Sequence, residues 1–325
     1  MLRYILRRLI FSIPVLLIAS FVVFFVIRST YSPTQILGIN PRITPEAALK
    51  FRAELGLDRS AWTQYWIWLK GFVTFDWGNS LLSNRPVWPD IREALANSAV
   101  LGGVGIFLSL ILGVGIGMLS ALRQYSFFDY AATSGAFLGL SIPTFWFALM
   151  VQLFFGVYIT RWFHLSQPIF YTTGMTLPGS EGFDLMDRIR HLALPVLVLS
   201  VQIVAVYSRY MRASLLEVMQ SDYMRTARAK GLHERLVISR HAMRNALIPI
   251  TTQLALDIGL IAGGLIVTET IFAWPGMGRL FIDAATIGDY QVVLPWMMVT
   301  VMFVIIFNLI ADMLYAVLDP RIRYA

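Results

Sequence analysis

The stretch from Ala99 to Ala121, AVLGGVGIFLSLILGVGIGMLSA, contains no charged residue. A helix needs about 20 mostly apolar residues to cross the hydrocarbon core of a bilayer, and this stretch is long enough. Three further stretches are also uncharged, the last reaching that length only with its flanks: Leu9–Ile27, Ala131–Ile159 and Leu192–Ser208. Two more contain acids, namely Leu247–Phe272 with Asp257 and Glu269, and Val292–Leu314 with Asp312. The sequence therefore predicts an all-α integral membrane protein with six transmembrane helices.

The composition supports this class. Hydrophobic residues make up 57% of the 325 residues and charged residues only 14%, whereas soluble domains are about 25% charged. The absence of cysteine excludes disulfides, thiolate metal sites and cysteine nucleophiles. The net charge of +7 comes from basic residues beside apolar runs, which indicates membrane topology rather than nucleic-acid binding.

Both ends of the chain are predicted to be cytoplasmic. Arg3, Arg7 and Arg8 precede the first apolar run, as they would in a secretory signal peptide. The run ends at Arg28 without a small-residue cleavage site, so we expect a retained helix. Six spans place both termini on one side, and the predicted inner loops hold more Lys and Arg than the short outer loops. We therefore expect a multi-pass protein of the cytoplasmic membrane.

The spans are unevenly spaced. Residues 1–98 are expected to form an N-terminal helix and an extracytoplasmic segment, Arg28–Ser98, with a helix at Pro45–Leu55 behind Thr44. The Trp-rich stretch from Trp62 to Trp68 is expected at the membrane interface, which indole rings favour. Residues 99–325 are expected to form a five-helix transmembrane domain that contains the polar loop 209–246.

Small residues and prolines modify the predicted spans. Gly113 with Gly117, and Gly259 with Gly263, have the spacing that permits close helix packing, although glycine is common in membrane helices that do not pack closely. Pro143 and Pro195 each remove a backbone donor and are expected to kink or offset their helices.

The loop before the fifth span is patterned. Apolar residues recur at i, i+4 spacing and predict one face of an amphipathic helix: Met211, Leu215, Met219, Tyr223 and Ala227. Gly231 is expected to end it in the left-handed conformation, and a second helix is expected at His233–Asn245. Either the basic face lies on anionic lipid, or the small residues around Gly231 dock into a partner's groove. The residues alone leave both possibilities open.

Two fragments of this loop, DYMRTARAKGL (Asp222–Leu232) and RHAMRNALIP (Arg240–Pro249), resemble the inner loop of oligopeptide and dipeptide ABC importer permeases. The resemblance extends almost end to end and includes, in order, the opening MLRYILRR, ELGLDR (Glu54–Arg59), FDWGNSL (Phe75–Leu81), SIPTFW (Ser141–Trp146), ETIFAWPGMG (Glu269–Gly278) and DPRIRY (Asp319–Tyr324). The chain resembles the B-type of the two permease subunits. The implied fold is that of a type I ABC importer permease.

The resemblance implies a coupling role for the loop. It is similar to the Glu-Ala-Ala motif of binding-protein-dependent importers, although Arg244 occupies the expected proline position and the nearest proline is Pro249. This departure leaves the end of the docking helix open. The residues implied to contact the ATPase are Arg225, Thr226, Ala227, Arg228, Ala229, Lys230, Gly231 and Leu232.

The implied partners are a second homologous permease subunit forming a heterodimer, two nucleotide-binding ATPase subunits or one fused ATPase, an extracytoplasmic peptide-binding protein and the lipid bilayer. Nucleic acid is not expected. The implied cargo is an oligopeptide or dipeptide, and nickel or another small solute of the same family is the alternative. The Arg28–Ser98 segment and the turn at Trp274–Gly276 are implied to support the binding protein.

The residues themselves favour a non-catalytic subunit. A P-loop requires glycine directly before its lysine, but Lys50, Lys70 and Lys230 follow leucine, leucine and alanine. ATP and magnesium are therefore expected on partner subunits, with no cofactor on this chain. The four histidines lack zinc-site spacing, and an aspartate dyad of Asp257 with Asp312 is only weakly supported. A secondary transporter, which commonly has paired repeats, and a membrane-anchored enzyme or scaffold are the rival classes.

Asp257 is the second candidate site residue. A carboxylate inside a span costs about 2.5–3.5 kcal/mol on insertion scales, so it is expected to face the bundle interior or water. It either lines the translocation path and meets cationic groups of a peptide, or accepts hydrogen bonds from a neighbouring helix. Glu269 is expected at the interface or packed against a loop.

Overall fold

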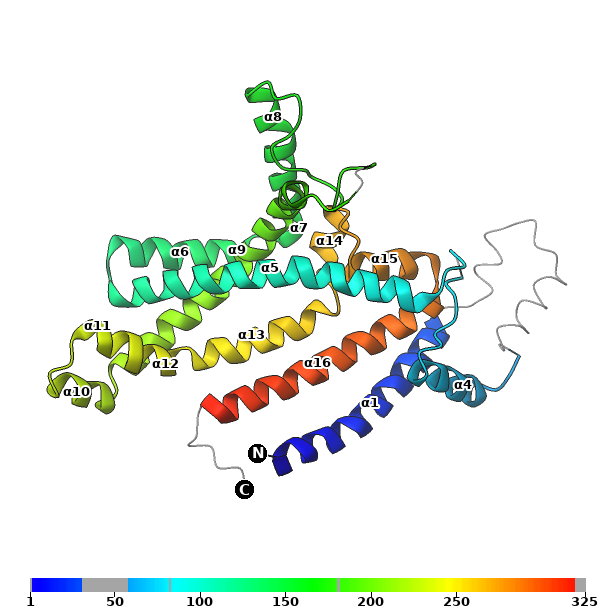
Figure 1. Cartoon of the computed structure of the whole chain (residues 1–325), viewed down its shortest axis with the longest axis horizontal. Helices are drawn as coiled ribbons and strands as arrows, with labels where there is room; N and C mark the ends of the chain where they lie inside the picture. Colours follow the sequence, from blue (N-terminus) through cyan, green and yellow to red (C-terminus); the bar gives the residue numbers. More distant parts are fainter. Residues whose placement is uncertain (1, 31–57, 82, 180–181, 319–325) are drawn as a thin grey trace. The chain divides into compact units, whose positions relative to one another are not determined.

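The described residues are mostly helical (Figure 1). The computed structural model describes residues 2–30, 58–81, 83–179 and 182–318. Within these residues the one extended pairing is an isolated bridge between Asn79 and Pro86. The predicted all-α class is confirmed. The expected helix at Pro45–Leu55 lies outside the described residues.

The helices divide between two compact units. The first unit comprises Met1–Ser98, Ala262–Ile266 and Pro275–Ile305, and the second Ala99–Ile261, Val267–Trp274 and Ile306–Ala325. The first contains α1 (Leu2–Thr30), α4 (Ala61–Val73), α15 (Met277–Ile287) and the beginnings of α5 (Val87–Leu122) and α16 (Tyr290–Leu318). The second contains α6 (Phe127–Ser141), α7 (Thr144–Gln152), η1 (Leu153–Tyr158), α8 (Ile159–Trp162), α9 (Leu185–Met219), α10 (Asp222–Ala229), α11 (Glu234–Leu236), η2 (Val237–Ala242), α12 (Met243–Ala246), α13 (Ile248–Ile261) and most of α14 (Ile266–Ile271).

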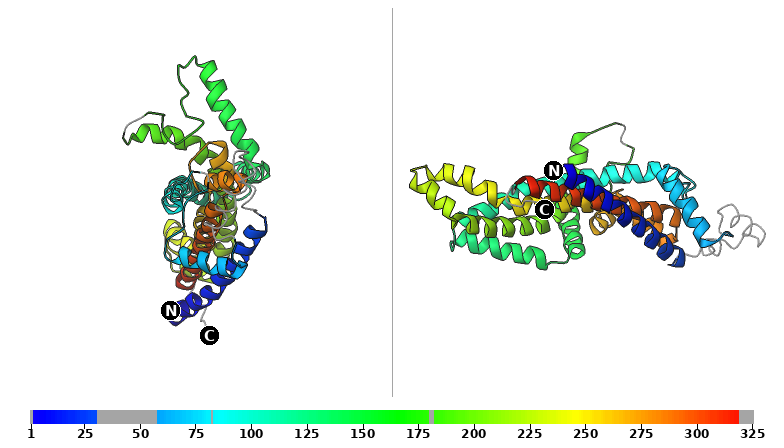
Figure 2. Two further views of the ribbon diagram at one scale, coloured as in Figure 1. Left: turned by 90° about the vertical axis from the view of Figure 1, so that its right-hand side faces the viewer. Right: turned by 90° about the horizontal axis from the view of Figure 1, so that it is seen from below.

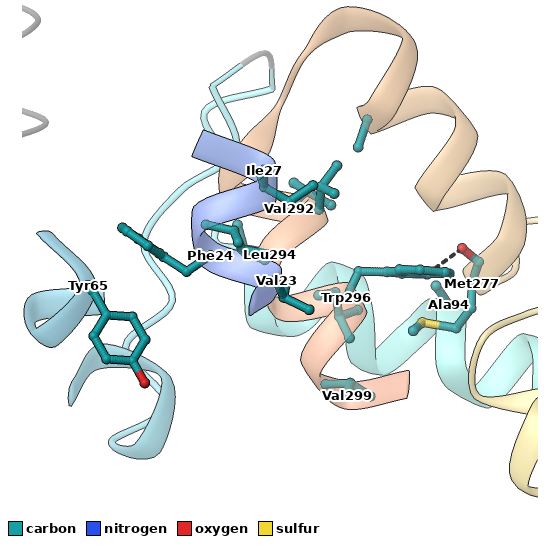
Figure 3. Packing of buried hydrophobic residues seen from close by; sticks show 14 residues of the cluster. Val23, Phe24, Ile27, Tyr65, Ala94, Met277, Val292, Leu294, Trp296 and Val299 are labelled. Atoms are coloured by element: carbon teal, nitrogen blue, oxygen red, sulfur yellow. Dashed lines mark hydrogen bonds between the residues drawn. The ribbon is translucent and has the colours of Figure 1, made fainter. Parts of the chain in front are cut away.

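The first unit is built around an apolar core in which α1 packs against the beginning of α16 (Figure 3). Val23 and Phe24 of α1 are buried together with Val292 and Trp296 of α16. The indole Nε1 of Trp296 donates a hydrogen bond of 2.8 Å to the carbonyl oxygen of Met277 (Figure 3). This bond satisfies the one polar atom of a large buried ring, so the ring contributes its apolar area without an unpaired donor.

The second unit depends on close contact between α5 and α9. A Cβ added at Gly113 would lie 2.6 Å from the Cβ of Tyr207, and one added at Gly117 would lie 2.6 Å from the Cβ of Met211. The close packing that the spacing of this glycine pair permits is therefore present between α5 and α9. α9 also packs along α6 (Figure 2).

Among the described residues, five helices are long and apolar enough to cross a membrane, and Ile248–Ile261 is a shorter apolar helix. The five are Arg7–Thr30, Val87–Leu122, Thr144–Trp162, Leu185–Met219 and Tyr290–Leu314. Together with the shorter helix they are roughly consistent with the six predicted spans, but several limits differ from the predicted ones. α5 begins at Val87 rather than Ala99, and α9 extends beyond the predicted Leu192–Ser208 at both ends.

The third predicted span is not one helix. α6 ends at Ser141, Ile142 is extended, and α7 begins after Pro143. Proline has no N–H and disfavours the helical conformation of the residue before it. The amide Nε2 of Gln202 on α9 donates to the Thr144 hydroxyl at 2.8 Å and to the Ile142 carbonyl at 3.5 Å. A side chain of the neighbouring helix thus satisfies the broken backbone, as membrane proteins require. Pro195, by contrast, lies within a continuous α9.

The fifth predicted span, Leu247–Phe272, is also interrupted. α13 ends at Ile261, and α14 begins at Ile266. Gly264 between them has a φ of +76°, a conformation that L side chains rarely adopt. A single continuous helix over this range was therefore a wrong expectation, because periodicity of apolar residues does not report a left-handed break.

Candidate functional site

The patterned loop forms a short helix that is separated from the end of α9 by a two-residue turn. α9 ends at Met219, Ser221 is extended, and α10 runs from Asp222 to Ala229. Asp222 lies in its first turn and Arg228 in its last, which is the charge order that suits the helix dipole. The expected single amphipathic helix from Met211 to Ala227 is therefore wrong, because the chain breaks within it.

The break changes which side chains are buried. Met224 and Ala227 of α10 are buried against Met211 and Leu215 of α9. Tyr223, which continued the i, i+4 pattern, is only half-buried. The same core includes Ala121 at the end of α5 and, from the chain that follows α10, Val237, Ala242, Ala246 and Ile250. The apolar face of α10 is thus packed into its own unit.

The opposite face of α10 and the turn after it are exposed. Of the eight predicted coupling residues, Ala227 is buried and Leu232 is half-buried. The others are exposed: Arg225, Thr226, Arg228, Ala229, Lys230 and Gly231. Gly231 has a φ of +74° and open space around it, so backbone conformation alone favours glycine there. The predicted left-handed end of the helix is confirmed.

Two polar contacts link α10 to the segment that follows it in the sequence. The Arg228 guanidinium binds the Glu234 carboxylate through Nε and Nη2, the shortest contact being 2.9 Å. These bonds lower the pKa of Glu234. Asn245 Nδ2 donates to the Tyr223 hydroxyl at 2.8 Å. The predicted second helix is present as α11, η2 and α12, running from Glu234 to Ala246 with a π-helical middle. These three short helices lie beside α10 at one end of α9 (Figure 1).

A buried ion pair beside this region was not anticipated from the sequence. Asp129 on α6 is 3% exposed and binds Arg212 of α9 in a bidentate pair, with Nε at 2.7 Å and Nη2 at 2.8 Å. It also accepts hydrogen bonds from the Ser120 hydroxyl and from the backbone N–H of Tyr125. The bonds from Arg212 hold the pKa of Asp129 well below its usual range, against the opposing effect of burial.

The sequence indicates a local role for Asp129 but not its partner in the ion pair. Ser126 and Asp129 have the spacing of a helix-start motif, and the Ser126 hydroxyl accepts a hydrogen bond from the Asp129 N–H. That spacing predicts where α6 begins. It does not identify Arg212 as a partner, because the pairing exists only when α9 lies against α6.

Asp257 is held by side chains of its own unit. Its Oδ2 accepts a hydrogen bond of 2.7 Å from the hydroxyl of Tyr207 on α9, and its Oδ1 accepts one of 2.8 Å from Gln253, one turn away on α13. Tyr207 is fully buried, and Asp257 is half-buried. This is the geometry expected for hydrogen bonding to a neighbouring helix. Glu269 is fully buried, which fits packing within the protein rather than an interfacial position.

Within the described part of the chain, no cluster of three or more His, Asp or Glu side chains is placed to hold a metal ion.

Comparison with known proteins decides the family. The sequence profile described as "Binding-protein-dependent transport system inner membrane component" matches residues 113–324, and the profile of the corresponding N-terminal region matches residues 1–97. The chain belongs to this family. α10 and its exposed turn therefore lie in the inner membrane component of a binding-protein-dependent transport system.

Curated relatives match over their whole length. The chain is 39% identical over 325 residues to the oligopeptide transport system permease protein AppB of Bacillus subtilis, covering 100% of both chains. It is 36% identical to the dipeptide transport system permease protein DppB of Escherichia coli K12, covering 100% of this chain and 99% of the relative. Among solved structures, an inward-facing form of the MetNI methionine ABC transporter matches with a TM-score of 0.52 at 15% identity, covering 72% of this chain and 98% of that one. This last match supports the permease fold.

We predict that replacing Asp129 by asparagine destabilises the protein by about 2 kcal/mol, because Arg212 loses its charged partner in a largely buried site. The measurement is the free energy of unfolding by denaturant titration in mixed micelles. Asp222→Asn is the matched control. Its side chain is 97% exposed and lies 3.7 Å from Arg225, so a change below about 0.5 kcal/mol is expected.

The pH dependence provides a second readout of the same variant. Because the folded pKa of Asp129 is lowered from its ordinary value of 3.8, its contribution is fully present above that value and is lost as the pH falls below it. The difference between wild type and Asp129→Asn should stay constant between neutral pH and about pH 5 and shrink in stronger acid. A difference that grew on acidification would contradict the assignment.

Proposed function

We propose that the chain is a permease subunit of an ATP-driven oligopeptide or dipeptide importer and forms half of its translocation pathway. The end-to-end similarity to AppB and DppB, whose names state these substrates, supports the cargo class. No observation on this chain favours nickel over peptide.

The observation that carries the coupling role is the two-sided character of α10. Its apolar side, Met224 and Ala227, is locked into the core that contains the ends of α5 and α9. Its other side, with the turn at Gly231, projects small and basic residues into solvent. A force applied to the exposed side would therefore be transmitted to α5 and α9 through close-packed side chains, since protein interiors are stiff and do not absorb displacement.

In this proposal nucleotide-binding subunits bind Arg225–Leu232. When they bind ATP they close against each other, and this closure moves the permease between inward-open and outward-open states. ATP and magnesium belong to those subunits. Arg225 and Lys230 are exposed and would steer the encounter with acidic groups on the ATPase. Arg228 has a structural role, because its guanidinium forms an ion pair with Glu234 and so holds α10 against α11.

The remaining partners are a second homologous permease subunit, an ATPase pair or a fused ATPase, and an extracytoplasmic peptide-binding protein. The proposed orientation places both termini and α10 in the cytoplasm. It follows from the distribution of Lys and Arg among the loops.

Co-purification tests the function directly. We expect the chain, solubilised from its own membrane, to retain a second permease and nucleotide-binding subunits, and the reconstituted complex to import peptide only with ATP. An isolated chain or homodimer that moved solute without an ATPase would contradict the proposal and favour a secondary transporter.

A substitution series at Gly231 tests the coupling role. Asparagine tolerates positive φ and should retain uptake, alanine should reduce it because the left-handed conformation costs about 1–2 kcal/mol, and proline should abolish it because its ring fixes φ near −65°. Proline also removes the Gly231 N–H that donates to the Arg228 carbonyl at 2.9 Å. The measurements are peptide uptake and ATP hydrolysis stimulated by the binding protein, in proteoliposomes. Stimulated uptake at the wild-type rate in Gly231→Pro would rule out the docking role.

Asp257→Asn separates the two roles weighed for this residue. Asparagine can still accept the hydrogen bond from Tyr207, so the α9–α13 contact should persist and the complex should assemble. If Asp257 attracts the cationic groups of a passing peptide, uptake of cationic peptides should fall more than uptake of neutral ones. Equal uptake of both classes, at wild-type rates, would leave Asp257 with the hydrogen-bonding role alone.

A further inference from the structure

One face of α4 exposes large apolar side chains. Trp62 is 59% exposed, Trp66 60%, Ile67 49% and Val73 68%. Trp62, Trp66 and Val73 follow one another at spacings of four and seven residues, so they form a single stripe along the helix. The other face is buried, with Tyr65 at 4% exposed.

The buried face of α4 is fixed on the last turns of α1. The hydroxyl groups of Tyr65 and Ser20 are hydrogen-bonded at 2.9 Å. Trp62, at the edge of the exposed stripe, also reaches α1, with its ring centroid 5.5 Å from that of Phe21. Arg28 Nε donates to Gln64 Oε1 at 3.2 Å. Because these contacts run from Ser20 to Arg28, the position of α4 along α1 is set by them.

This position corresponds to a defined depth in a bilayer. The apolar run of α1 ends at Arg28, where the chain must reach the polar boundary. Phe21 lies seven residues earlier, which is about 10 Å deeper at 1.5 Å per residue. The exposed stripe of α4 is therefore expected within the boundary between headgroups and acyl chains.

α1 also exposes apolar side chains. Ile18, Val22 and Val26 are 65%, 50% and 52% exposed on α1 and would contact lipid in a spanning helix. The exposed Phe21 of the same helix is in ring contact with Trp62, so the stripe of α4 lies against apolar surface near the end of the span. Its chemistry also fits the boundary, since indole rings are enriched there and the exposed Lys70 can extend its amine to the headgroups.

We propose that α4 is an interfacial helix whose Trp62, Trp66 and Val73 stripe is inserted in the lipid leaflet where α1 ends. The helix then fixes the depth of α1 and gives the first unit an attachment to the bilayer beyond its spanning helices. The chain beyond α4 leaves the membrane, because Asp76 and Asn79 are exposed polar residues. This inference concerns the lipid surface and does not depend on the proposed transport function.

The absence of cysteine from the chain makes a direct test possible. Spin labels are attached to single cysteines in Trp66→Cys and Val73→Cys, with Val15→Cys, 52% exposed on α1, as the lipid control and Asn79→Cys as the water control. The full chain is reconstituted in vesicles of phosphatidylethanolamine and phosphatidylglycerol. Collision rates of each label with oxygen, which partitions into lipid, and with a water-soluble nickel chelate are then measured by electron paramagnetic resonance.

We expect the oxygen-to-nickel ratio at both α4 positions to be several-fold higher than at Asn79→Cys and lower than at Val15→Cys. A ratio equal to that of Asn79→Cys would place the stripe in water and overturn the proposal. Low collision rates with both reagents would mean that protein covers the stripe, which also overturns it. Val73→Cys leaves both tryptophans in place, so a failure of Trp66→Cys to fold does not remove the test.

Discussion

The structure depends on the requirement that backbone polar groups inside a bilayer be satisfied by the protein itself. Long uninterrupted helices meet this requirement within their own chain, as α5 and α9 do. Where a helix breaks, a side chain must supply the missing partner. Gln202 does so at the break before Pro143, and Gln152 donates to the carbonyls of Thr172 and Ile271 in the same unit. Glutamine in these helices therefore has a structural use.

Buried charged side chains also need partners within the protein. Asp129 and Asp257 both lie in the second unit, and both have their oxygens engaged by neighbouring side chains. The partners differ, and so do the consequences. Arg212 stabilises Asp129 as a carboxylate, and the ion pair links α6 to α9. Tyr207 and Gln253 are neutral donors, so these contacts give Asp257 hydrogen bonds but no ion pair.

The mechanical properties of α10 follow from its burial on one side only. Its length of eight residues is too short for an isolated helix to be stable in water. It persists because Met224 and Ala227 are packed with residues from α5, α9 and α13, and because Arg228 and Tyr223 bind the chain that follows. A helix stabilised in this way moves together with the elements that hold it.

The sequence alone determined the class of the protein, the approximate positions of its spans, the left-handed turn at Gly231 and, through resemblance, its family. These depend on composition, on runs of apolar residues and on local backbone preference, all of which are written along the chain. Tertiary structure decided the rest: the breaks at Pro143 and Gly264, the turn at Ser221 that buries Met224 in place of Tyr223, and the pairing of Asp129 with Arg212. Each of these depends on which helix packs alongside. The local pattern of apolar residues does not identify a neighbour that is distant in the sequence.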